Sequence, residues 1–194
     1  MKLDPEIRLA ASPIAELVKA ILDASEYCAL KVQPFLNFSE ASLNRSRYIC
    51  ATFEFVYFFL HIMNRHALQK LGHSRMNSLQ ELVGPLVATS IIETFYEDRP
   101  ERDKDEVRTV FYDNLNRAEL GYSNCKELVS SVDPFSKDAL LSRLAWYVAN
   151  LCPDPTNKPL ILSIIESAFE KWRQLSLDDV LVRCHEFTTE DNRN

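Results

Sequence analysis

Apolar residues recur along most of the chain every three or four positions, the spacing that places them on one face of a helix. The first helix is expected at about 13–32, because Ser12 is a suitable N-cap and Pro13 fits the first helical position. Further helices are predicted at about 39–71, 78–95, 107–121, 136–152, 159–175 and 176–187, with a short helical segment at 125–132. No stretch alternates for long enough to predict a sheet.

Short motifs set the expected ends of these helices. Gly72 follows the second helix at the position where glycine commonly ends one. The run Ser78-Leu-Gln-Glu81 matches a capping box, so the third helix is expected to begin there. The pair Gly84-Pro85 predicts a kink or a restart within that helix. The charged run at 98–106 is expected to form a solvated turn, and Gly121 is expected to end the helix that follows it.

These patterns predict an all-α fold, an irregular bundle of six or seven helices around a long central hydrophobic helix at about 39–71. We expect residues 1–187 to form a single all-helical domain and residues 188–194 to form a frayed polar tail. The length of 194 residues is typical of one domain. The chain contains only three glycines, which argues against a sheet with many tight turns and against glycine-rich phosphate-binding loops.

The net charge and the cysteine content limit which cellular compartment and which classes of binding partner are expected. The formal net charge is −6, so we expect no nucleic-acid partner and no anionic membrane partner. The most apolar window, residues 49–63, has 12 apolar residues in 15 and is too short to span a membrane. The five cysteines lack the CxxC spacing of metal or redox sites, and the first residues lack an apolar signal segment, so a cytoplasmic location with reduced thiols is expected.

The helix expected at 39–71 carries one line of polar residues on an otherwise apolar surface. At 100° per residue, Arg47, Glu54, His61 and Arg65 fall within a stripe about 40° wide, and Tyr57 flanks it. Three interpretations are open for this stripe. It is the solvent-facing edge of the helix, an internal network paired with a neighbouring helix, or one wall of a pocket that binds a ligand or an ion.

A second polar line lies on the predicted third helix and includes Glu93. If the two lines faced each other, Glu93 would approach Glu54 and His61. We therefore take Glu54, Tyr57, His61 and Glu93 as the candidate ligand-binding residues.

No motif assigns catalytic or metal-binding residues. The Glu-x-x-His pairs of helical di-iron proteins do not occur, and neither does a Gly-x-Ser-x-Gly nucleophile elbow or a Walker loop. The pair Asp178-Asp179 is interpreted as first-turn acids that suit the helix dipole. The cofactor is therefore unknown, and the sequence leaves open whether the protein is an enzyme.

Two functional hypotheses follow. The first is a non-catalytic helical protein that acts through self-association or a protein partner, because 11 Phe and 7 Tyr exceed what one core needs and suit an interface. The alternative is a small-molecule or metal-binding helical protein, either an enzyme or a binding protein, with a pocket beside the helix that contains Glu54 and His61. The identity of the ligand or partner and the oligomeric state do not follow from the sequence.

Overall fold

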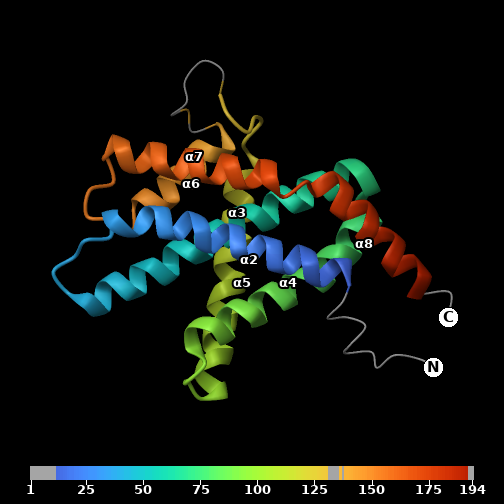
Figure 1. Ribbon diagram of the computed structural model, residues 1–194, viewed down its shortest axis with the longest axis horizontal. Coiled ribbons are helices and arrows are strands. Elements are labelled where there is room, and N and C mark those ends of the chain that lie inside the picture. The colour runs from blue at the N-terminus through green and yellow to red at the C-terminus, as the bar shows by residue number, and fades with distance from the viewer. Residues whose placement is uncertain (1–11, 131–135, 137, 192–194) are drawn as a thin grey trace.

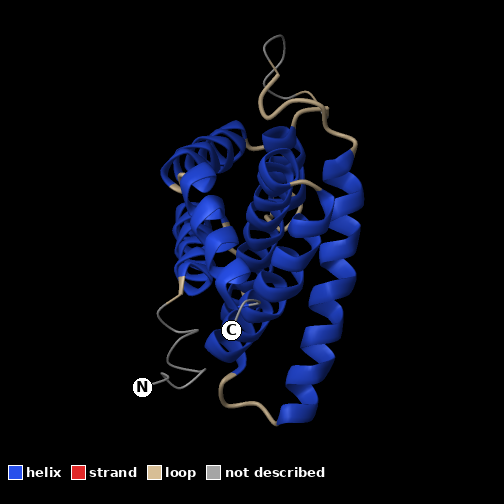
Figure 2. Ribbon diagram, turned by 90° about the vertical axis from the view of Figure 1, so that its right-hand side faces the viewer, coloured by secondary structure: helices blue, strands red, loops and turns tan. Residues whose placement is uncertain are grey.

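The computed structural model describes residues 12–130, 136 and 138–191, with side chains described as far as Glu186. Within these residues the chain forms seven α-helices and one short 3-10 helix, with no strand (Figure 1) (Figure 2). This arrangement confirms the all-α prediction. The elements are α2 (Pro13–Val32), η1 (Gln33–Phe35), α3 (Ala41–Leu71), α4 (His73–Tyr96), α5 (Glu101–Ser123), α6 (Leu140–Ala149), α7 (Lys158–Gln174) and α8 (Leu177–Asp191).

Local signals set the start of α2, whose bounds match the prediction. The hydroxyl of Ser12 accepts a hydrogen bond from the backbone N–H of Ala15 at 3.2 Å, and Pro13 occupies the first helical position. The apolar face that begins with Ile14 and Leu17 is buried in the core. The same logic holds for α7, where the side chain of Asn157 caps the helix.

The central helix of the bundle is α3, as predicted. It packs against α2, α4, α5, α6 and α8, and Figure 1 shows it lying beside α2 across the molecule. Phe55, Phe58 and Phe59 in its middle are completely buried. One continuous core cluster draws side chains from all seven helices. Within the described residues, no helix combines the length and the hydropathy that crossing a bilayer requires.

The junction between α3 and α4 lies earlier than predicted. Gly72 has a φ of 79°, so the chain turns at this single residue. Its N–H donates to the carbonyl of Leu68 at 3.1 Å, and its own carbonyl accepts from the N–H of Met76 at 3.0 Å. The capping box expected at Ser78 is therefore wrong, because α4 already begins at His73. The hydroxyl of Ser78 donates instead to the carbonyl of Ser74 within the helix.

Two helices extend through positions where a break in the helix was expected. The helix α4 is continuous through Gly84 and Pro85, so there is no restart at this pair. The helix α5 begins inside the charged run, at Glu101, and continues past Gly121 to Ser123. Both helices pack against neighbouring helices of the bundle, and tertiary packing commonly outweighs local propensity.

The short helix predicted at 125–132 is wrong over residues 125–130, and the remainder lies outside the described residues. The backbone of this segment bonds to the chain entering α6 and not to itself. The carbonyl of Glu127 accepts from the N–H of Leu140 at 2.9 Å, and the carbonyl of Leu128 accepts from the N–H of Leu141 at 3.1 Å. These bonds fix the start of α6 at Leu140, later than the predicted start at about 136.

At the C-terminal end, α8 continues to Asp191, four residues beyond its predicted end at 187. Only residues 192–194 of the predicted polar tail lie outside the described part of the chain.

Candidate functional site

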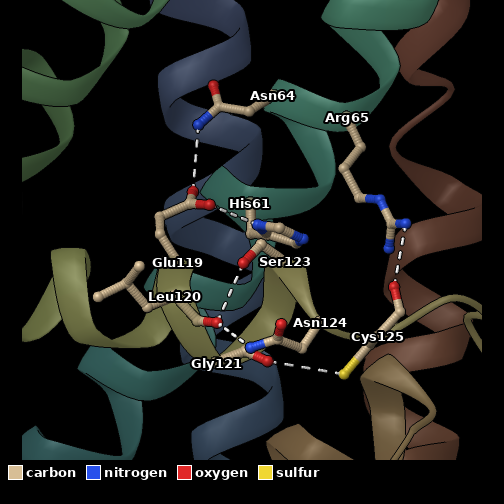
Figure 3. Close-up of polar contacts among 9 residues, drawn as sticks. All are labelled: His61, Asn64, Arg65, Glu119, Leu120, Gly121, Ser123, Asn124 and Cys125. Carbon is tan, nitrogen blue, oxygen red and sulfur yellow. Dashed lines mark hydrogen bonds and ion pairs between the residues drawn. The ribbon is translucent and has the colours of Figure 1, made fainter.

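The polar stripe of α3 is internal at its centre. His61 is only 4% exposed, whereas Arg47, Glu54 and Arg65 are partly buried. Near the end of the stripe, the guanidinium of Arg65 donates to the carbonyl of Cys125 at 3.1 Å, which ties α3 to the chain that follows α5 (Figure 3). At His61, therefore, the stripe does not form a solvent-facing edge.

A hydrogen-bonded network joins this part of α3 to α5. Nδ1 of His61 lies 2.5 Å from Oε2 of Glu119, and Oε1 of Glu119 accepts from the amide of Asn64 at 3.2 Å (Figure 3). One carboxylate thus holds two side chains of α3, one turn apart, and we call this the His61–Glu119–Asn64 network. Two of its atoms, Nε2 of His61 and Oδ1 of Asn64, are buried without a hydrogen-bond partner in the described structure. Buried polar atoms normally have partners, so this network has unused hydrogen-bonding capacity.

Glu54 lies two helical turns before His61 on the same stripe of α3. It has no hydrogen bond or ion pair with any described residue. Burial raises the pKa of its carboxyl group from 4.5 to about 7. A carboxyl group in this state is partly protonated and partly charged near neutral pH, when most surface carboxyls are fully ionised. Such a group is suited to exchanging a proton or to pairing with a cation, and many groups of this kind occur at functional sites.

Tyrosine residues of three helices surround this region. Burial raises the pKa of Tyr57 on α3 and of Tyr122 on α5, and the nearby charge of Glu54 adds to both increases. Both hydroxyls are buried and lack a hydrogen bond; the amide of Asn114 lies close to Tyr57 without completing one. The ring of Tyr122 packs against His61 at 5.2 Å and against Tyr147 of α6 at 5.7 Å, measured between centroids.

Glu93, the remaining predicted site residue, belongs to a different cluster. Its carboxylate accepts from Nζ of Lys104 at 2.6 Å, an ion pair that links α4 to the first turns of α5. The hydrogen bond to Glu93 raises the pKa of Lys104. Among the described residues no hydrogen bond or ion pair joins Glu93 to Glu54 or His61. Glu93 is therefore apart from the other three candidates, which lie along one side of α3. Nor do three or more His, Cys, Asp or Glu side chains, as far as they are described, converge on a point that suits a metal ion.

A cavity of about 530 Å³ lies beside the network, between α3, α4 and α5, and we call it the α3–α4–α5 cavity. Asn64 lines this cavity and is also a member of the network. Gly84 lines it from α4, and a Cβ atom added there would meet no atom within 4 Å. The full lining is Leu60, Asn64, Asn77, Gln80, Glu81, Gly84, Pro85, Tyr112, Leu115 and Asn116.

Sequence patterns did not indicate Asn64, Glu119 or Tyr122 as site residues. The available signal was weak: Glu119 follows Ala118, a position of the predicted apolar face of its helix, and a charged residue at the border of such a face often contacts a neighbouring helix. Whether Glu119 pairs with His61 depends on how α5 is placed against α3, and sequence patterns do not specify that placement.

Comparison of the chain with models of protein families, with curated proteins and with solved structures gave no match.

Proposed function

We propose that this chain is a small-molecule binding protein whose ligand occupies the α3–α4–α5 cavity. The observation that carries the proposal is the position of Asn64, which lines the cavity and is held by the carboxylate that also holds the buried His61. The cavity volume of about 530 Å³ lies in the range typical of small-molecule sites. A ligand there would contact three helices at once. Through Asn64 it would also contact the His61–Glu119–Asn64 network, which extends into the core.

The composition of the cavity wall supports binding. Leu60 and Leu115 are buried apolar residues, and amide side chains stand among the other lining residues. Ligand sites commonly combine an apolar wall with a few polar groups that fix orientation. Because Asn64 is already held in place by Glu119, part of the site is ordered before a ligand arrives, which reduces the entropic cost of binding.

A test of this proposal fills the cavity. Gly84→Leu places a side chain in open space on a helix that already runs through this position, whereas Gly84→Ala adds only a methyl group. We expect members of a chemically diverse fragment set, screened by ligand-observed NMR, to bind the wild-type protein and the Ala variant. The same fragments should bind the Leu variant at least tenfold more weakly. If no fragment binds, or if all hits bind the Leu variant as well as the wild type, the proposal is wrong.

A second candidate function is self-association or contact with a protein partner. Trp146 is 52% exposed and Leu120 is 70% exposed. Their chain neighbours, Tyr147 and Gly121, are in contact, so the two exposed side chains lie on adjoining helices. Exposed apolar residues of this kind occur in interfaces. Light scattering over a wide concentration range should then show a mass above that of one chain, which Trp146→Glu reduces; a constant single-chain mass argues against self-association.

The cytoplasm remains the proposed compartment. All five cysteines lie in the described part of the chain, and none forms a disulfide. Burial raises the pKa of the Cys28 thiol to about 12, which keeps it protonated and unreactive. Reduced thiols in the core are typical of proteins in a reducing compartment.

A further inference from the structure

The wall of the α3–α4–α5 cavity is rich in carboxamide groups. Asn64, Asn77, Gln80 and Asn116 contribute four of the ten lining residues. Asn77, Gln80 and Asn116 are exposed, and each offers two N–H donors and a carbonyl acceptor on one planar group, whereas the amide of Asn64 already donates to Glu119. Together they match a ligand that carries donors and acceptors side by side, such as vicinal hydroxyl groups or the edge of a heterocyclic base.

The cavity wall does not suit an anion. Glu81 is the one charged side chain among the described lining residues, and it is negative. Arg108, whose charge lies close enough to lower the pKa of Tyr112, is engaged by Asp105 and by Glu101 on its own helix. Binding of phosphate or carboxylate groups generally needs an available cation or several directed donors. The net charge of −6 further disfavours approach of an anionic ligand.

The same wall has a flat apolar component. Tyr112 of α5 and Pro85 of α4 line the cavity together with the buried side chains of Leu60 and Leu115. The ring of Tyr112 packs edge-on against that of Phe111, at an interplanar angle of 88° and with the centroids 5.5 Å apart. An aromatic ring with polar groups nearby accepts a flat ligand face while leaving the ligand edge to hydrogen-bond.

From these three features we infer, on the basis of the proposed function, that the α3–α4–α5 cavity binds an uncharged ring with a hydrogen-bonding edge and discriminates against its phosphorylated form. A neutral saccharide and a free nucleoside share this chemistry, and binding measurements distinguish them.

Calorimetric or NMR titrations of the full chain with matched pairs test the inference. The probes are methyl glucoside and glucose 6-phosphate, uridine and its 5′-monophosphate, and adenosine and its 5′-monophosphate. We expect at least one uncharged member to bind and its phosphorylated partner to bind at least tenfold more weakly. Gln80→Lys should reduce this discrimination at least threefold, because it adds a cation to the wall. The matched variant Gln69→Lys changes an exposed position on α3 outside the cavity and should leave it unaltered.

Four results would overturn the inference. The first is a phosphorylated member that binds as tightly as its uncharged partner. The second is discrimination that Gln80→Lys and Gln69→Lys change equally. The third is a failure of every uncharged ring to bind while other fragments bind in a manner sensitive to Gly84→Leu; that result rejects the ligand class and leaves the proposed function standing. The fourth is binding of an uncharged ring that is insensitive to Gly84→Leu; that result places the ring outside the cavity and rejects both the proposed site and the inference drawn from its wall.

Discussion

Glu119 on α5 accepts a hydrogen bond from Nδ1 of His61 on α3 at 2.5 Å. No other described side chain forms a hydrogen bond with this imidazole ring. The imidazole is almost completely buried, so loss of the carboxylate would leave it without any partner. We expect Glu119→Ala to lower the free energy of unfolding by roughly 1–3 kcal/mol, the cost of an unsatisfied buried polar group. Chemical denaturation followed by circular dichroism measures this change.

The matched control for this prediction is Asp113→Ala, which removes an exposed carboxylate from the same helix. Its effect should stay within about 0.5 kcal/mol. Glu119→Gln should fall between the two, since an amide keeps one acceptor oxygen for His61. Equal stabilities for the Glu119→Ala and Asp113→Ala proteins would show that the contact between α3 and α5 contributes little.

Parts of the fold that depend on local chemistry could be predicted from the sequence. The start of α2 is fixed by Ser12 and Pro13, which act within one turn of the chain, and its predicted bounds are correct. The start of α4 was missed because the capping box at Ser78 competes with a turn at Gly72, and the tertiary packing of the following residues favours the earlier start. The segment at 125–130 was missed because its backbone partners lie in the chain that enters α6.

The same division holds for the candidate site. Helical spacing placed Glu54, Tyr57 and His61 together on one helix, because that spacing is a property of the sequence alone. The partners Glu119 and Tyr122 depend on how α5 is rotated and shifted against α3, which local patterns do not specify. The cavity, which needs three helices in their final positions, could not be predicted at all.

Gly121 and Tyr147 make a close contact between α5 and α6. A Cβ atom at position 121 would overlap the hydroxyl group of Tyr147 and come within 3.2 Å of its Cζ atom. We therefore expect Gly121→Ala to destabilise the protein by roughly 1–3 kcal/mol, the usual range for an overpacked core. In a double-mutant cycle with Tyr147→Phe, much of this loss should be recovered, because the overlapping oxygen is removed. If the stability changes of the two single variants simply add in the double variant, this explanation is wrong.

Gly84 provides the opposite case on α4. It has a helical backbone, and a Cβ atom there meets no atom within 4 Å. Gly84→Ala should therefore stabilise the protein by about 0.5–1 kcal/mol, the ordinary gain when alanine replaces glycine within a helix. Thermal and chemical denaturation both measure the effect. A loss of stability would mean that the α3–α4–α5 cavity is not open next to this residue.

Glu54 makes the stability of the protein depend on pH in a predictable direction. Burial raises the pKa of its carboxyl group from 4.5 to about 7, so the folded state favours the protonated form. Below the ordinary pKa the group is protonated in both states and carries no penalty. Between about 4.5 and 7 the unfolded chain ionises first, and the stability associated with this protonated group is lost as the pH rises through the folded value.

Glu54→Gln tests this reasoning, because glutamine resembles the protonated carboxyl group in size and charge. At pH 8 the variant should be more stable than the wild type by roughly 1–3 kcal/mol, the lower end allowing for partial contact of the side chain with water. At pH 4 the difference should vanish, since the wild-type side chain is then protonated as well. Glu166→Gln, at an exposed position on α7, should change stability little at either pH. If the Glu54→Gln protein is less stable than the wild type at pH 8, the ionised carboxylate is stabilised by a favourable partner. Its burial is then not a net cost to the folded state.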